Sequence, residues 1–153
     1  MDTIRYVEMT DDRHADAIIG MMKGLYAEDD ATAPRDPGRF GETLRVFLSE
    51  PQRGRVIFFL GPGDALHGYC ILIPIWSNEL GGINAFIDEL FVRPESRRRG
   101  IARGLFKFIE RDRPFGAVAV SLEASSKNQA AWSLYTSLGL EPRPFTTMLR
   151  VFS

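Results

Sequence analysis

The sequence contains one cysteine and two histidines among its 153 residues. A disulfide needs two cysteines, so the chain cannot form one internally, and a reducing cytoplasmic location is expected. His14 and His67 have no partner at the spacing of metal ligands, so we expect no metal site. The start of the chain lacks the apolar segment of a signal peptide, and we expect none. The longest apolar run, CILIPIW at 70–76, is too short to span a bilayer, which excludes a membrane-spanning segment.

Positive charge is scarce everywhere except in one short segment. Residues 1–92 carry a net charge of −7, residues 93–113 one of +5 and residues 114–153 one of +1. A nucleic-acid-binding protein usually has a broad basic face, so this distribution argues against nucleic acid as a partner. It favours a protein that holds a compact anion at one place and attracts a cation at another.

The common phosphate-binding loops are also absent. No G-x-x-x-x-G-K-[ST] motif occurs, which disfavours a nucleotide triphosphatase. The segment GPGDALHG at 61–68 begins like G-x-G-x-x-G but has Leu66 at the third glycine position. We interpret it as a turn between strands.

Hydrophobic periodicity predicts an alternation of helices and strands along one domain, residues 1–153. Strands are expected at 3–9, 55–60, 68–76, 82–92, 117–124 and 146–152, and helices at 10–29, 39–50, 100–113 and 128–139. The strands at 82–92 and 117–124 flank a helix, so they should be parallel. The predicted fold class is α/β (mixed α+β): a mostly antiparallel sheet of six to seven strands, with helices on both faces and one parallel pair.

The basic segment lies at the start of the helix that joins the parallel pair. VRPESRRRGIARGL at 92–105 places Arg97, Arg98, Arg99 and Arg103 around Gly100, Ile101 and Ala102. The first N–H groups of a helix lack internal partners, and the helix dipole adds positive charge there. Small residues permit close approach of the backbone to a ligand, and one arginine side chain can form two parallel hydrogen bonds to phosphate oxygens. These features predict a phosphate site.

The stretch IDELFVRPESRRRGIARGLFKFIE resembles the central motif of the GCN5-related N-acetyltransferases, [QR]-x-x-G-x-[GA], with Arg97, Gly100 and Ala102 at the matching positions. NQAAWSLYTSLGL looks like the closing motif of that family, with Asn128, Ala131, Tyr135 and Gly139 in place. Ala102 and Leu140 depart mildly from the commonest residues. The resemblance covers nearly the whole chain. It implies the family's fold, in which the parallel pair is splayed at the cofactor site, and acetyl-coenzyme A as acetyl donor. Within the family, the segments LYAEDD, IWSNELGG and IDELFV are loosely similar to the diamine and spermidine acetyltransferases.

Acetyl transfer to an amine requires an acid for the leaving thiol, a base for the amine and donors for the developing oxyanion. The resemblance gives Tyr135 the acid's role. Asn128 would either bond the pantetheine or cap its own helix. The backbone N–H of Phe91 or Val92 is the expected partner of the oxyanion or the pantetheine.

Asp88 and Glu89 are the candidate bases, because they end an otherwise apolar strand. Adjacent strand residues point to opposite faces, so only one would normally line the site. A β-bulge, typical of this strand in the family, would let both do so. The choice between the two carboxylates stays open at this point.

Two further residues are candidates for substrate binding. Glu28, with Asp29 and Asp30, ends the first helix and would form either an acidic rim for a polyamine-like substrate or a solvated acidic loop. Trp76 would stack over an alkyl amine, although a packing role fits it too.

The sequence therefore predicts an enzyme that moves the acetyl group of acetyl-coenzyme A to a primary amine of a small basic molecule, by direct attack in a ternary complex. The alternatives are a peptide or protein N-acetyltransferase and a non-catalytic acyl-coenzyme A binding module. The partners expected are a small-molecule amine and, as is common for such folds, a second copy in a homodimer, with no nucleic acid or membrane.

Overall fold

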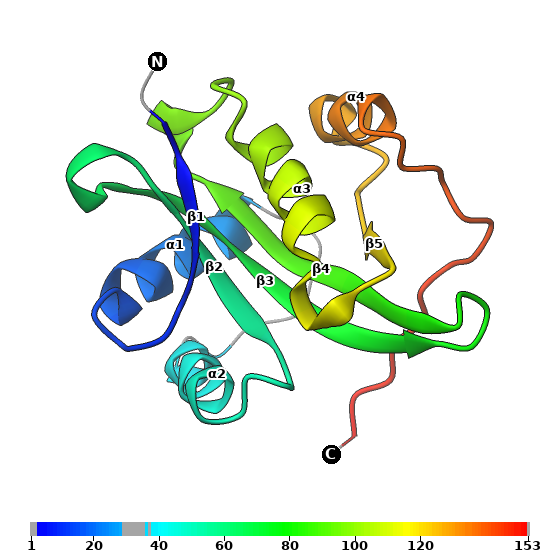
Figure 1. The fold of residues 1–153 in the computed structure, drawn as a ribbon, viewed down its shortest axis with the longest axis horizontal. Helices are drawn as coiled ribbons and strands as arrows, with labels where there is room; N and C mark the ends of the chain where they lie inside the picture. Colours follow the sequence, from blue (N-terminus) through cyan, green and yellow to red (C-terminus); the bar gives the residue numbers. More distant parts are fainter. Residues whose placement is uncertain (1–2, 29–35, 37, 153) are drawn as a thin grey trace. The chain divides into compact units, whose positions relative to one another are not determined.

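The computed structural model describes residues 3–28, 36 and 38–152. Its strands form one five-stranded sheet in the order β1-β2-β3-β4-β5 (Figure 1). The strands are β1 (Arg5–Glu8), β2 (Arg55–Leu60), β3 (Leu66–Ser77), β4 (Gly82–Val92) and β5 (Ala119–Leu122), and the α-helices are α1 (Ala15–Glu28), α2 (Gly38–Ser49), α3 (Ile101–Asp112) and α4 (Gln129–Ser137). Three short 3₁₀ turns, η1 (Pro62–Asp64), η2 (Pro94–Ser96) and η3 (Pro114–Gly116), join them.

The described residues divide into two compact units. The first runs to Glu123 and holds the whole sheet with α1, α2 and α3, and the second begins at Ala124 and holds α4. That the chain is one domain stays a prediction.

The pairing of the strands agrees with the expected class. β1, β2, β3 and β4 pair antiparallel in sequence order, and β4 pairs with β5 in parallel. A parallel neighbour needs a crossover connection, which α3 provides. Residues 93–100, which include η2, connect the carboxyl end of β4 to the N-terminus of this crossover helix.

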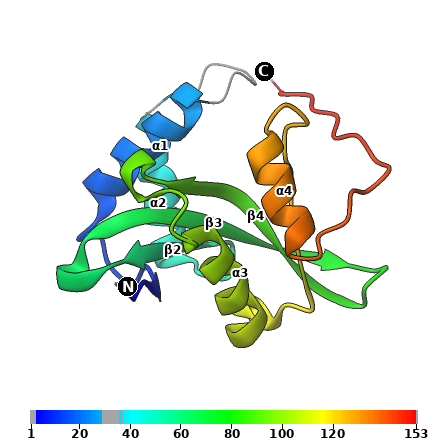
Figure 2. The ribbon, with the colours of Figure 1, turned by 90° about the horizontal axis from the view of Figure 1, so that it is seen from above.

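Each face of the sheet is covered by helices. α1 and α2 lie on one face and α3 on the opposite face (Figure 2). Consecutive residues are buried along β2 (56–60) and β3 (68–72), as two covered faces require, because neighbouring side chains point to opposite faces. Phe58 belongs to the core beneath α1 and α2, whereas Phe59 contacts Tyr6, whose ring also packs on Phe108 of α3.

The local sequence explains where α3 begins and ends. Its buried side chains, Ile101, Leu105, Phe106 and Ile109, recur at helical spacing. Gly100 precedes the helix at φ +78°, a left-handed conformation that glycine adopts without a steric penalty. At the other end, the N–H of Arg113 bonds the carbonyl of Ile109 at 2.9 Å, and Pro114 cannot continue the helix.

The expected strand at 146–152 is wrong, and the sheet has five strands rather than six to seven. No residue from 140 to 152 is in a strand, and the large apolar side chains there are exposed, 93% for Met148 and 84% for Phe152. An extended segment is stable as a strand only where a neighbouring strand forms hydrogen bonds with it and packs on its side chains. No described strand pairs with this segment.

Candidate functional site

The parallel strands separate before β4 ends. Their last paired residues are Ile87 and Leu122, and β4 continues for five more residues to Val92. The backbone of this extension has β3 on one side and no strand of the described chain on the other. Its outward N–H and C=O groups can therefore bond a ligand.

A β-bulge at Asp88 decides which backbone groups point outward, and it confirms the bulge expected from the sequence. Glu89 is opposite Ile71 and Ile87 is opposite Leu72, so Asp88 is the extra residue. The bulge reverses the alternation of backbone groups along β4.

Hydrogen bonds on both sides of the bulge fix this alternation. Before it, the carbonyl of Ile83 points toward β5, where it accepts from the N–H of Val118 at 2.8 Å. After it, the N–H of Arg93 points toward β3 and bonds the carbonyl of His67 at 2.8 Å. Since both backbone groups of a strand residue point to the same side, Leu90 and Val92 direct their N–H groups to the open side. Of the two candidates from the sequence, Val92 has the outward N–H and Phe91 faces β3.

The two candidate carboxylates differ sharply in environment. Asp88 is exposed, and no hydrogen bond or ion pair joins it to another described residue. Loss of water around its carboxylate, together with the negative charge of Glu123, raises the pKa of Asp88 above its usual value. A carboxylate with a raised pKa is a better proton acceptor.

Glu89, in contrast, is only 8% exposed and is held by two phenols. The hydroxyl of Tyr26 on α1 donates to Oε1 at 2.6 Å, and that of Tyr69 on β3 donates to Oε2 at 2.8 Å. Burial, and then the charge of Glu89, raise the pKa of Tyr69 far above its usual value, so its hydroxyl stays protonated. This cluster fastens α1 to the strand residue that follows the bulge.

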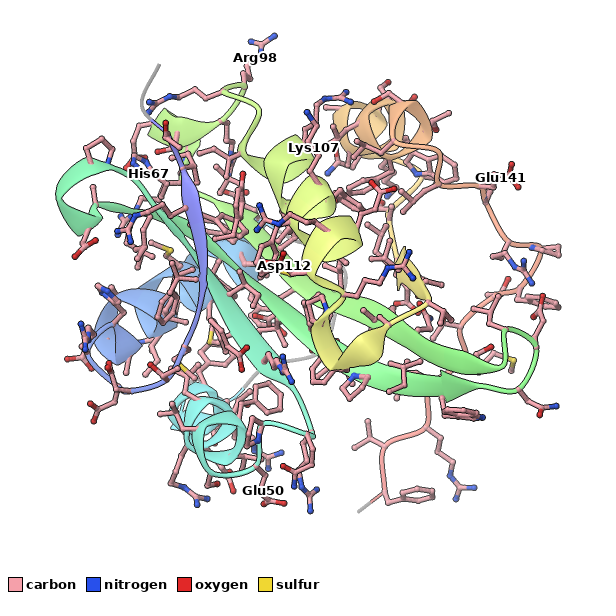
Figure 3. All side chains as sticks on the ribbon, in the orientation of Figure 1. Glu50, His67, Arg98, Lys107, Asp112 and Glu141 are labelled. Carbon is pink, nitrogen blue, oxygen red and sulfur yellow. The ribbon has the colours of Figure 1, made fainter. Side chains whose placement is uncertain are left out.

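The turn before α3 has the geometry of an anion site. Arg98 at φ +62° and Gly100 at φ +78° are both left-handed, and no side chain caps the helix. The first amides of α3, at Ile101 and Ala102, therefore remain available. A Cβ at Gly100 would meet nothing within 4 Å, so the space beside this turn is open. The side chain of Arg98 points away from the protein in Figure 3.

Arg97 and Glu28, assigned to cofactor and substrate from the sequence, bond one another. A guanidinium nitrogen of Arg97 donates to both carboxylate oxygens of Glu28 at 2.8 Å, and Nε donates to the carbonyl of Val92 at 2.9 Å. The guanidinium also lies over the ring of Phe91, 5.7 Å from its centre. The end of α1 is thus joined to the turn that precedes α3. Arg99 and Arg103 lie in and just after that turn, and both are exposed.

Asn128 and Tyr135 lie on α4 in the second unit. The side chain of Asn128 accepts from the N–H of Ala131 at 3.1 Å, so it caps this helix, which was one of its two expected roles. Tyr135 is half-buried in the second turn. Its carbonyl accepts from the N–H of Leu140 at 3.0 Å, while Gly139 at φ +84° turns the chain out of the helix.

Trp76 is not brought to Asp88. It pairs with Ile83, five residues along β4 from Asp88, which is about 16 Å of extended strand. The side chain is 69% exposed near the end of the β3–β4 hairpin. Its role in substrate binding stays a prediction, and the remaining rim candidates, Asp29 and Asp30, lie outside the described residues.

Sequence reasoning missed four residues of this region: Tyr26, Tyr69, Leu90 and Glu123. An isolated glutamate in an apolar strand signals that buried donors are needed. The partners follow only from the strand register and from the position of α1. The described part of the chain holds no group of three His, Cys, Asp or Glu side chains that could bind a metal ion. Among the same residues, no helix is long and apolar enough to cross a membrane.

A family model described as the acetyltransferase (GNAT) family matches residues 22–140. The chain belongs to the GNAT acetyltransferase family. GNAT enzymes take their acetyl group from acetyl-coenzyme A, so the chain is an acetyl-coenzyme A dependent acetyltransferase. No curated protein matches the sequence significantly.

Solved structures share the GNAT fold at low sequence identity. A possible acetyltransferase from Clostridium difficile 630 is 20% identical with a TM-score of 0.82, and the match covers 98% of each chain. The aminoglycoside N-acetyltransferase AAC(6')-Iy in complex with CoA is 17% identical with a TM-score of 0.79, covering 99% of this chain and 96% of that one. A predicted acetyltransferase with acetyl-CoA from Clostridium acetobutylicum is 14% identical with a TM-score of 0.75, covering 97% and 96%.

Proposed function

We propose that this GNAT protein acetylates a primary amine of a small basic molecule by direct attack in a ternary complex. The observation that carries the proposal is that an exposed carboxylate, Asp88, lies where β4 has no neighbouring strand. The carboxyl end of the same strand continues into the turn before α3, which has the geometry of an anion site. A proton acceptor for the amine and a phosphate site for the cofactor are two of the features that acetyl transfer from acetyl-coenzyme A to an amine requires. The aminoglycoside acceptor named for AAC(6')-Iy supports a small basic substrate.

The turn at 97–103 would hold the pyrophosphate of the cofactor. Its free helix amides, the open space at Gly100 and the exposed arginines all favour a phosphate group. Acetyl-coenzyme A supplies the acetyl thioester. The outward N–H of Val92, and that of Leu90, would bond the pantetheine or the thioester carbonyl oxygen.

Asp88 is the proposed base of the reaction. Its exposed carboxylate would take the proton of the incoming ammonium group, directly or through water, and so leave a neutral amine. Glu89 is engaged by Tyr26 and Tyr69, and we assign it the support of the bulge instead. The family motif assigns Tyr135 the protonation of the leaving thiolate.

The cofactor site can be tested separately from the acceptor. Isothermal calorimetry should show acetyl-coenzyme A binding, and Gly100→Glu should weaken it severely by placing bulk and negative charge among the helix amides. Gly116→Glu is the matched control, because Gly116 has a similar φ of +71° and open space at its Cβ. Equal binding by the two variants would place the pyrophosphate elsewhere.

The reaction itself is tested by thiol release from acetyl-coenzyme A with a panel of amines, from diamines and polyamines to aminoglycosides and peptides. We expect turnover with cationic small molecules and its loss in Asp88→Asn. Turnover with peptides alone would replace the proposed acceptor by a protein. We also propose that the protein is cytoplasmic and forms a homodimer. Light scattering on the purified protein would test the dimer.

A further inference from the structure

Glu123 is the first residue beyond β5, as Asp88 is the first residue of β4 beyond the last pair of the parallel ladder. That last pair is Ile87 and Leu122, so the two acidic side chains occupy the next position on each strand. Both are exposed. The bulge at Asp88 and the end of β5 coincide at this point, so the two carboxylates flank the place where the strands separate.

We propose that Glu123 determines specificity for a cationic acceptor by forming, with Asp88, a paired carboxylate that holds the ammonium group of the substrate. This inference rests on the proposed function and adds to it a residue of β5. It defines the acceptor as an amine that is protonated at neutral pH, because only a cation relieves the repulsion between two carboxylates.

Electrostatics supports the proximity that the register indicates. The charge of Glu123 is one of the two causes that raise the pKa of Asp88. Asp88 in turn acts on the buried thiol of Cys70 on β3, which burial keeps protonated by raising its pKa. Glu123 is therefore the charged group that acts on Asp88, and no Arg or Lys of the described chain forms an ion pair with Asp88.

The pair also serves the proton transfer. The substrate arrives as R–NH₃⁺ between the carboxylates, and one proton passes from nitrogen to Asp88, leaving R–NH₂. The amine nitrogen then forms a bond to the acetyl carbon, the carbon–sulfur bond breaks, and the nitrogen gives up a second proton while the departing thiolate gains one. The products are the acetamide and coenzyme A thiol, and the proton on Asp88 returns to solvent. The negative charge of Glu123 raises the affinity of Asp88 for that proton.

Glu123→Gln tests the pair, with Glu110→Gln as its control. Glu110 is an exposed carboxylate on α3, so both variants lose one negative charge from the surface. The acceptors are the best cationic amine of the panel and 4-methoxyaniline, which is neutral at pH 7. For the cationic amine, Glu123→Gln should lower kcat/KM about fivefold, the factor for ~1 kcal/mol, the upper range for an exposed ion pair. For 4-methoxyaniline, and for acetyl-coenzyme A affinity, little change is expected.

A second measurement tests the interaction between the Asp88 and Glu123 carboxylates in the absence of substrate. In protein labelled with ¹³C at aspartate carboxyl carbons, NMR titration should show a lower pKa for Asp88 in Glu123→Gln and no change in Glu110→Gln. The acid limb of the pH–rate profile should move to lower pH in the same variant, because Asp88 loses a neighbouring negative charge. A change confined to folding would leave both readouts at their parent values.

The outcomes separate the two proposals. A parent enzyme that acetylates no amine overturns the proposed function, whereas the NMR titration still decides whether the carboxylates interact. A parent enzyme that works, with Glu123→Gln indistinguishable from Glu110→Gln in rate and titration, overturns the pair alone. A shifted titration with unchanged discrimination between the two amines overturns the specificity role.

Discussion

Gly104, in the first full turn of α3, leaves room for a tyrosine from β1. A Cβ at this position would lie 2.0 Å from the hydroxyl oxygen of Tyr6 and 2.8 Å from its Cζ. That hydroxyl donates to the carbonyl of Ile101 at 2.7 Å, and burial raises the pKa of Tyr6 to about 12, so it stays a donor. The ring is packed against Phe59 and Phe108, with centres 5.5 and 5.8 Å away. Gly104→Ala must therefore displace Tyr6.

The opposing contributions to the stability of Gly104→Ala can be compared. Overpacking costs about 1–3 kcal/mol and the lost hydrogen bond about 1 kcal/mol. Alanine in place of glycine stabilises a helix by about 1 kcal/mol. The free energy of unfolding should consequently fall by about 1–3 kcal/mol, and the melting temperature should fall by about 2–4 °C for each kcal/mol lost.

A double-mutant cycle identifies Tyr6 as the obstacle. In Tyr6→Phe the closest atom is gone, so adding Gly104→Ala should destabilise the protein by about 1–2 kcal/mol less than it does in the parent. Urea unfolding followed by circular dichroism at 25 °C measures all four proteins. If Gly104→Ala were as stable as the parent, helix propensity would outweigh the contact. If the two changes simply added, the clash would lie elsewhere.

Three further predictions concern the site. Tyr135→Phe should lower kcat by about 10²–10⁴-fold while acetyl-coenzyme A affinity and Tm stay near the parent values; retained activity with altered stability would indicate packing instead. Arg98→Gly should raise Tm by about 2–4 °C, because it relieves a left-handed residue at φ +62°, whereas Arg99→Gly, at a position without positive φ, should not. The raised pKa of Asp88 means that its charged form is disfavoured in the folded state, so stability falls as pH rises through that pKa. Asp88→Asn should therefore raise Tm at pH 7, with the difference shrinking in acid, and Asp112→Asn should lower it, because Arg111 depresses the pKa of Asp112.

The elements that could be predicted from the sequence are those with a clear internal period. The strand at 82–92 has the bounds that its pattern indicated, and α3 differs by one residue at each end. The segment at 146–152 was also expected to be a strand and forms none. The difference is that a helix satisfies its hydrogen bonds internally, whereas a strand depends on a neighbour that its own sequence does not specify.

The candidate site likewise has features that a local motif predicts and features that depend on the tertiary structure. The glycine and arginine turn before α3 is contiguous, so its motif was sufficient to locate it. Which carboxylate is exposed depended on the bulge at Asp88 and on donors contributed by residues 20 and 63 positions away from Glu89 along the chain. Glu123 reaches the site through the register of a parallel pair, and no local pattern in β5 marks it.

Unfavourable local features gather in the short segment between Asp88 and Gly100. It contains a bulge, an exposed carboxylate with a raised pKa, unpaired amides on β4 and a left-handed arginine. Each would lower the stability of the chain wherever it occurred, and each leaves a group available to a ligand. Hydrogen bonds and an ion pair hold the surrounding backbone in place. They are the hydrogen bonds from the two tyrosine hydroxyls to Glu89, the Arg97–Glu28 ion pair and the hydrogen bond from the Tyr6 hydroxyl to the carbonyl of Ile101. A site arranged in this way should gain stability from substitutions that remove its polar and left-handed groups, and should lose turnover with each of them.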